Sequence, residues 1–195
     1  MGASPISSRV AIGFAIAAFA LEATAGAMYA AASGDTSGLS VNPANLLASG
    51  ATGAGLIRWG SLIDMLGYLS LAPVVLYLRA RYPGRYVDLF AFAGLAVVVI
   101  GSIGAISMAT AAPPMINGYV GATAAEKLAL LPAFATLYRT VVVGMWQTLE
   151  TIPWAIWLLG TAVVMRRQGP GVVFVILLVA GALNAAIALY RLVVG

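Results

Sequence analysis

The hydrophobic residues of this chain fall into five long, continuous runs. An apolar helix needs about 20 residues to cross the hydrocarbon layer of a bilayer, and every run is at least that long. The runs cover about residues 10–32, 56–78, 86–111, 137–165 and 172–194. A membrane β-barrel would instead require alternating polarity. The pattern therefore predicts an all-α integral membrane bundle with five transmembrane helices.

The composition agrees with a chain that lipid covers. Hydrophobic residues make up 62% of the 195 residues, and charged residues only 8%. A soluble domain carries roughly 25% charged residues, so this chain has too few charged residues to cover the surface of a soluble domain. The first run is also too long for the core of a signal peptide. No change of composition divides the chain, and residues 1–195 are expected to form a single transmembrane domain.

The links between the runs are of two kinds. Residues 79–85 and 166–171 are short and contain proline and glycine, so they predict tight turns between antiparallel helices. Residues 34–55 and 112–135 are long. In the first, Asn42-Pro43 predicts the start of a short helix. In the second, Thr123 and Glu126 have the spacing of a capping box, which predicts a short amphipathic helix at the membrane interface. A sixth span would have to come from these two segments, and neither has enough continuous apolar length.

Basic residues gather on one side of the predicted bundle. With five spans, the amino end and the two short links lie on the same side, and basic residues accumulate near cytoplasmic ends. This places the amino terminus in the cytoplasm and the carboxyl terminus outside. The net charge of +4 is thus explained by topology rather than by binding to nucleic acid. The residues concerned are Arg9, Arg79, Arg81, Arg85, Arg166 and Arg167.

The chain contains neither cysteine nor histidine. Zinc, copper and iron sites depend on thiolate or imidazole ligands, so we predict no metal site and no cofactor. No nucleophile–base pair or phosphate-binding loop is present either, and we assign no catalytic residue.

The informative residues are the polar ones inside the spans. A charge at the bilayer centre costs about 2.5–3.5 kcal/mol, so such a residue usually faces the interior of the bundle. At 1.5 Å per residue, these positions lie in the outer half of the bilayer or near its middle. With two aromatic residues in phase with them, they form the predicted ligand-binding cluster: Glu22, Arg58, Asp64, Tyr68, Arg139, Gln147, Glu150, Trp154, Asn184 and Arg191.

Helical phase places these residues on one stripe of each of four helices, since positions three, four and seven apart share a face. The stripes also contain Tyr29 in phase with Glu22, and Ser61 in phase with Asp64. The simplest arrangement turns all four stripes inward, around a polar cavity that opens to the outside.

Three hypotheses fit this cavity. Arginine binds carboxylate and phosphate groups through paired hydrogen bonds, which favours binding or transport of a small anionic or amphipathic ligand. Alternatively, the chain is a non-catalytic accessory subunit of a larger membrane complex, in which buried charges fix the structure. An enzyme that uses Asp64 or Glu150 as an acid or base is the third hypothesis. It is the least supported, because no second catalytic group accompanies either carboxylate.

The first half of the chain resembles a bacterial family of multi-spanning membrane proteins, catalogued as a domain of unknown function. The likeness lies in residues 45–49 and 56–64, including Arg58 with Asp64 six residues later, and in Arg9 and the Tyr77-Leu78-Arg79 exit. It implies a multi-pass protein of the bacterial inner (plasma) membrane, surrounded by lipid. Members of that family usually have six spans, so six is the alternative to the count of five.

Overall fold

The computed structural model describes residues 7–34, 42–82, 84–166 and 171–194, and the regular elements in these ranges are all helical. The predictions for Pro83, Arg167, Gly169 and Pro170, and for residues 35–41 of the first long link, lie outside the described residues.

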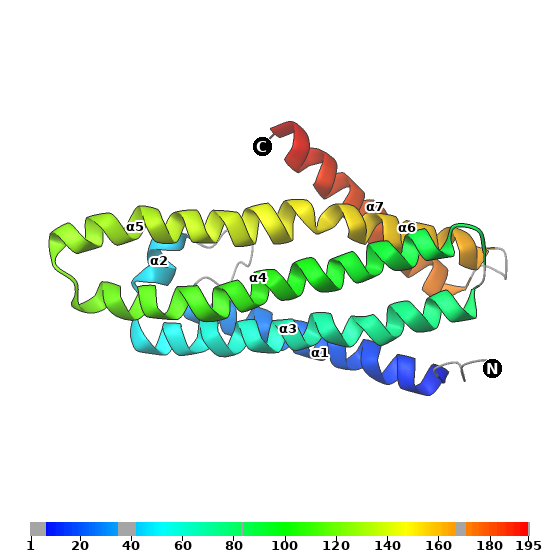
Figure 1. Cartoon of the computed structure of the whole chain (residues 1–195), viewed down its shortest axis with the longest axis horizontal. Helices are drawn as coiled ribbons and strands as arrows, with labels where there is room; N and C mark the ends of the chain where they lie inside the picture. The colour runs from blue at the N-terminus through cyan, green and yellow to red at the C-terminus, as the bar shows by residue number, and fades with distance from the viewer. Residues whose placement is uncertain (1–6, 35–41, 83, 167–170, 195) are drawn as a thin grey trace. The chain divides into compact units, whose positions relative to one another are not determined.

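Five helices are long and apolar enough to cross a membrane, which confirms the all-α class and the number of candidate spans. Three of them are α1 (Ser8–Ser33), α3 (Gly50–Arg81) and α4 (Val87–Gly121) (Figure 1). The fourth consists of α5 (Ala124–Tyr138), the π-helix η1 (Arg139–Leu149) and α6 (Thr151–Arg166) in one continuous run. The fifth is α7 (Val172–Val194).

Much of the two long links predicted between the spans, residues 34–55 and 112–135, is helical in the structure. The short helix expected at Asn42-Pro43 is present as α2 (Pro43–Leu47), and the Asn42 side chain accepts a hydrogen bond from the amide of Ala44 at 2.9 Å. The loop predicted at residues 112–135 is wrong. Helix α4 continues through Pro113-Pro114 to Gly121, and α5 begins only three residues later. The predicted boundaries followed the length of apolar sequence that a bilayer requires, whereas helix can continue past the bilayer.

The capping box at the start of α5 is confirmed. Thr123 accepts a hydrogen bond from the amide of Glu126, and the amide of Thr123 donates to the Glu126 carboxylate at 2.7 Å. However, α5 is not a separate interfacial helix, because it runs directly into η1.

The chain forms two compact units, which are described separately. Unit 1 comprises Met1–Ala18, Tyr68–Gly101 and Met145–Gly195, and unit 2 comprises Phe19–Gly67 and Ser102–Gly144. The single transmembrane domain stays a prediction.

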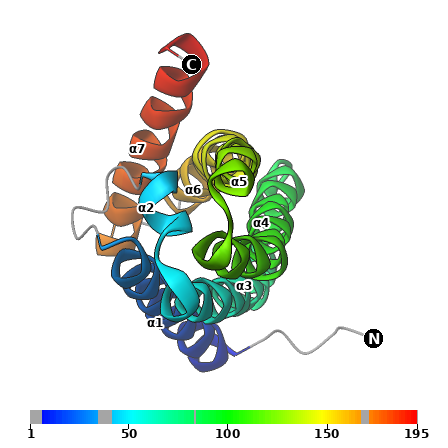
Figure 2. The ribbon, with the colours of Figure 1, turned by 90° about the vertical axis from the view of Figure 1, so that its left-hand side faces the viewer.

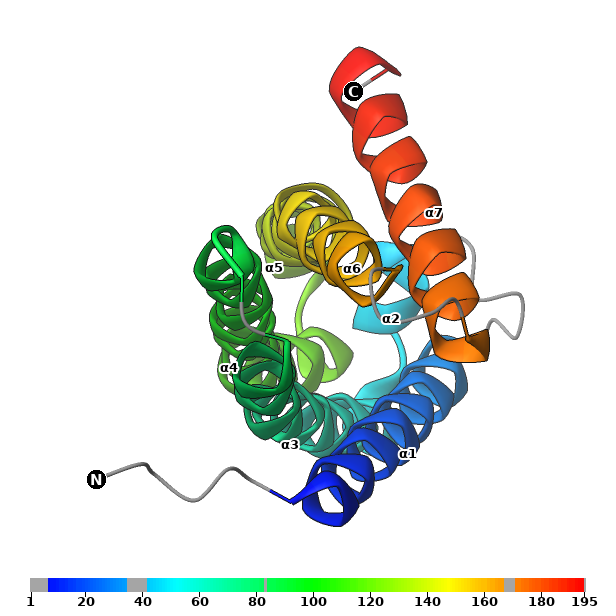
Figure 3. The same ribbon diagram turned by 90° about the vertical axis from the view of Figure 1, so that its right-hand side faces the viewer.

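Unit 1 has an apolar core built by α3, α4 and α6. Val75, Ala91 and Trp157 are its buried centre. Small residues allow close packing there: a side chain on Gly160 would overlap the ring of Phe90. Helices α6 and α7 lie side by side (Figure 3), and Gly181 of α7 is packed against Leu159.

In unit 2, α1 and α3 pack closely through small residues. A Cβ atom on Gly60 would lie 3.2 Å from the Cβ of Met28 and 3.6 Å from the carbonyl oxygen of Ala25. One on Gly53 would lie 3.7 Å from the carbonyl oxygen of Ala32. We call Ala25, Ala32, Gly53 and Gly60 the alanine–glycine seam. Small residues let helix backbones approach without a hydrophobic driving force.

The seam is also visible in the sequence, as a regular spacing of small residues. The predicted stripes rested only on the spacing of charged and polar residues and did not use this pattern. Buried alanines recur every seven residues along α1, and the glycines of α3 follow the same interval. A seven-residue repeat keeps one helix face against its neighbour. The positions are Ala11, Ala18, Ala25 and Ala32 in α1, and Gly53, Gly60 and Gly67 in α3.

Helix α2 lies beside α5 in unit 2 (Figure 2). The side chains of Leu46, Leu47 and Phe134 are fully buried, or nearly so. This packing gives the segment between α1 and α3 an apolar anchor.

Candidate functional site

The most unusual polar contact in unit 2 joins two acidic side chains. The carboxyl groups of Asp64 in α3 and Glu22 in α1 lie within range of a side-chain hydrogen bond. Asp64 is only 6% exposed, and Glu22 is half-buried. An ionised carboxylate can only accept hydrogen bonds, so a hydrogen bond between these two groups requires a proton on one of them. The pair is thus an arrangement that can share one proton between two candidate spans.

Neutral polar groups surround the carboxyl pair. The hydroxyl groups of Tyr29 and Ser61 are 2.7 Å apart, and the Tyr29 phenol is within electrostatic range of both acids. Gly67 leaves the space that the Glu22 carboxyl fills, because a Cβ there would lie 2.7 Å from the Glu22 Oε1 atom. Tyr29 and Ser61 are not members of the predicted cluster, although they share helical stripes with the two acids.

A second polar cluster lies in unit 1 around Glu150, which is 3% exposed. The Tyr68 hydroxyl donates to Glu150 Oε2 at 3.0 Å, and the Trp154 indole N–H donates to Oε1 at 2.6 Å. Both carboxylate oxygens thus have a donor. The structure brings together these three predicted site residues from α3, the end of η1 and α6.

Gly101 of α4 allows this arrangement. A side chain at Gly101 would overlap the ring of Tyr68, so the ring lies directly on the helix backbone. The indole N–H of Trp146 donates to the Gly101 carbonyl oxygen at 3.4 Å. Neither Gly101 nor Trp146 was among the predicted site residues. That prediction started from charged and polar side chains inside the spans, and these two residues carry no charge.

Two further predicted residues of unit 1 are joined, and a third forms a hydrogen bond within its own helix. Arg191 of α7 donates to the Gln147 side-chain oxygen of η1 at 2.7 Å. The Asn184 amide donates to the carbonyl of Ala180 in its own helix at 2.9 Å. This hydrogen bond lies within α7 and does not link Asn184 to the other predicted residues.

The arginines of unit 2 do not join the carboxyl pair. Arg58 and Arg139 are both exposed, and in the described part of the chain neither forms an ion pair with Glu22 or Asp64. The ion pair that the structure does show joins Arg79 to Asp88, at 2.6 Å in unit 1.

The π-helix η1 lies within the fourth span and changes which residues of that span share a helix face. Its hydrogen bonds reach back five residues, as the Glu150 amide does to the Met145 carbonyl at 2.8 Å. A π-turn takes more residues than the 3.6 of an α-helix. Arg139 is therefore not in α-helical phase with Glu150. The spacing of Glu150 and Trp154, which leads into α6, remains α-helical.

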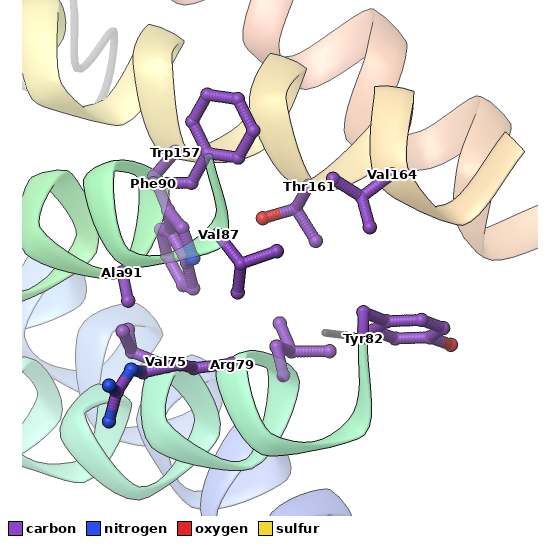
Figure 4. A pocket seen from close by; sticks show the side chains of 10 residues that line it. Val75, Arg79, Tyr82, Val87, Phe90, Ala91, Trp157, Thr161 and Val164 are labelled. Atoms are coloured by element: carbon purple, nitrogen blue, oxygen red, sulfur yellow. The ribbon is translucent and has the colours of Figure 1, made fainter. Parts of the chain in front are cut away.

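A cavity in unit 1 is too small for an organic ligand. Its volume is about 20 Å³, and it lies among residues of α3, α4 and α6 (Figure 4). A single water molecule needs about 10–15 Å³ by this measure. Val75, Phe90 and Trp157 line it, with the stem of Arg79 at one side. This space is a packing gap of the core.

Two larger hollows occur in unit 2. One, of about 380 Å³, lies between α3 and α4 and is bordered by Arg58, Leu62, Ile106, Ala109, Thr110, Pro113 and Pro114. We call it the Arg58 groove. The other, of about 420 Å³, lies near the turn between α4 and α5, where Glu126 is the charged residue at its edge. Ligand pockets commonly have about 300–1,000 Å³.

No known protein guides the assignment of these features. The chain matches no protein-family model, no curated protein and no solved structure. In the described residues, no group of three or more acidic side chains could hold a metal ion.

Proposed function

We propose that this chain is a multi-pass membrane protein that binds or transports a small ligand, with proton exchange at the Glu22–Asp64 pair. The observation that carries this proposal is the approach of the two carboxyl groups to within hydrogen-bonding range. Like charges so close cannot both ionise, and such pairs share one proton. A ligand that disturbs the pair would change its proton content, which is the physical basis of proton-linked binding.

The separation of arginines from this pair changes the ligand that we expect there. The protonated pair retains one negative charge, which disfavours an anion. A small cation or a neutral hydrogen-bonding molecule suits the Tyr29, Ser61 and carboxyl groups better. The anionic or amphipathic ligand that the sequence suggested is better matched to the Arg58 groove.

The proposal predicts that Asp64→Asn removes a protonated carboxyl group at neutral pH without unfolding the protein. Asparagine can still donate a hydrogen bond to Glu22, which can then ionise. Infrared spectroscopy of the protein in lipid nanodiscs would measure the carbonyl band of the protonated acid. We expect this band in the wild type and its loss in the variant.

The matched control is Asp88→Asn, which removes an exposed carboxylate. It should leave the band unchanged. A protonated-carboxyl band that persists in Asp64→Asn at its full intensity, or its absence from the wild type, would sink the proton-exchange proposal.

We place the protein in a bacterial inner membrane, with its amino terminus in the cytoplasm and its carboxyl terminus outside. The arginines at the amino end and in the short links support this orientation. The resemblance of the first half of the chain to a bacterial membrane family supports the choice of membrane.

The cysteine-free sequence offers a clean test of orientation. Ala80 near the end of α3 and Ala125 near the start of α5 are both exposed, and each can be replaced singly by cysteine. A membrane-impermeant maleimide should label Ala125→Cys in intact cells, and Ala80→Cys only after permeabilisation. The reverse pattern would show the opposite orientation.

One observation favours an accessory subunit as the second candidate. Each oxygen of the Glu150 carboxylate accepts a hydrogen bond, one from Tyr68 and one from Trp154, as expected of a polar network that fixes helix packing. Such a subunit would be recovered from native membrane as part of a larger complex. A monodisperse species of monomer mass would argue against it.

A further inference from the structure

The Arg58 groove combines one cationic side chain with an apolar wall. Arg58 is exposed at one end, while Leu62, Ile106 and Ala109 supply aliphatic surface from α3 and α4. Within the described residues, the guanidinium of Arg58 has no ion-pair partner. Its charge is therefore available to a molecule from outside the chain.

The position of the groove matches the boundary between lipid tails and headgroups. Arg58 precedes Arg79 by 21 residues in α3, about 32 Å of helix. Thr110 follows Asp88 by 22 residues in α4, about 33 Å. Both lengths approximate the roughly 30 Å hydrocarbon thickness of a bilayer. Trp59, 60% exposed beside Arg58, is the residue type that anchors helices at this boundary.

The proline pair adds hydrogen-bond acceptors to the same place. Proline lacks an amide hydrogen, so Pro113 and Pro114 free the carbonyl groups of Ala109 and Thr110, four residues earlier. The Thr110 hydroxyl donates to the carbonyl of Ile106 at 2.8 Å, which leaves its oxygen able to accept. The groove thus presents one cation and several acceptors to a headgroup.

We propose that the Arg58 groove binds an anionic phospholipid whose headgroup carries hydroxyl groups. Arg58 pairs with the phosphate, because arginine binds phosphate oxygens with two parallel hydrogen bonds. The headgroup hydroxyls donate to the freed carbonyls, and one acyl chain lies along Leu62, Ile106 and Ala109. This site does not depend on proton exchange at the Glu22–Asp64 pair.

Native mass spectrometry of the detergent-purified full chain tests the proposal. The probes are dioleoyl-phosphatidylglycerol, dioleoyl-phosphatidylcholine and inorganic phosphate. We expect one phosphatidylglycerol to bind about tenfold more tightly than phosphatidylcholine, which corresponds to about one net hydrogen bond. Both phosphates can pair with Arg58, but only the glycerol headgroup lacks a competing cation and donates hydroxyl groups to the freed carbonyls. Arg58→Gln should weaken phosphatidylglycerol binding and reduce this preference to the part that the hydroxyl–carbonyl hydrogen bonds supply. Arg58→Lys should weaken binding less, since lysine keeps the charge without the paired geometry.

Arg139→Gln is the matched control, because Arg139 is an exposed arginine outside the groove. It should bind phosphatidylglycerol as the wild type does, and so should Asp64→Asn. Equal losses in Arg58→Gln and Arg139→Gln would indicate nonspecific attraction to charge and overturn the site. Equal binding of the two lipids would overturn it as well. If inorganic phosphate at millimolar concentration displaced the lipid completely, the groove would be a site for free anions and the lipid proposal would be wrong.

Discussion

Replacing Gly101 with alanine is expected to destabilise the protein by about 1–3 kcal/mol, the usual cost of overpacking a core. The added methyl group would overlap the ring of Tyr68. The ring must then move away from α4, which draws its hydroxyl from the buried Glu150 carboxylate. A buried acceptor that loses its donor costs further free energy. The midpoint of thermal unfolding, followed by circular dichroism in detergent, measures the effect.

Gly118→Ala is the control on the same helix. No atom lies within 4 Å of the position that its Cβ would occupy. Alanine is favoured over glycine inside a helix by up to about 1 kcal/mol, so this variant should unfold at the same temperature or higher. Opposite signs for the two substitutions are the expected result. A fall of equal size in both would mean that Gly101 has no special contact with Tyr68.

Tyr68→Phe separates the two contributions. It keeps the ring on Gly101 and removes only the hydroxyl that donates to Glu150. Its cost should be smaller than that of Gly101→Ala if displacement of the ring matters in addition to the lost hydrogen bond.

Replacing Gly60 with leucine is expected to separate α1 from α3 and to lower stability by at least about 1–3 kcal/mol. The Cβ alone would already press on Met28, and the remaining atoms of leucine would meet the backbone of α1 at Ala25. Van der Waals packing is the main attraction between helices in lipid, so a wider spacing loses much of it. Fluorescence-detected size-exclusion chromatography after a temperature series reports the loss of folded protein.

Gly55→Leu provides the comparison within α3. The space around its Cβ position is open to 4 Å, and the added leucine can face lipid. We expect little change in its unfolding temperature. If Gly60→Leu behaved like Gly55→Leu, the alanine–glycine seam would not hold the two helices together.

The five spans could be predicted because hydrophobic length is a local property. Each run of apolar residues is visible without knowledge of its neighbours, and the structure confirms the five candidate helices. The capping box at Thr123 and the Asn42 cap were predictable for the same reason, since both involve residues two or three positions apart.

The polar contacts were predictable only in part. Glu150 and Trp154 are four residues apart, a spacing that places two side chains close together on a helix. The hydrogen bond between them confirms this proximity. The pairing of Glu22 with Asp64 depends on which faces of α1 and α3 meet. Small residues decide that choice through the seven-residue repeat, which a pattern of charged positions does not reveal. The π-helical hydrogen bonds of η1 leave no compositional mark, so the phase of Arg139 could not be derived.

The carboxyl pair also has a consequence for biosynthesis. Glu22 emerges from the ribosome about 40 residues before its partner Asp64. At about 5–20 residues per second, α1 waits roughly 2–8 seconds for that partner. During this interval the insertion machinery must shelter the Glu22 carboxyl from lipid, or the group must enter the bilayer already protonated. In either case the contact between Glu22 and Asp64 forms only after the second helix has been made.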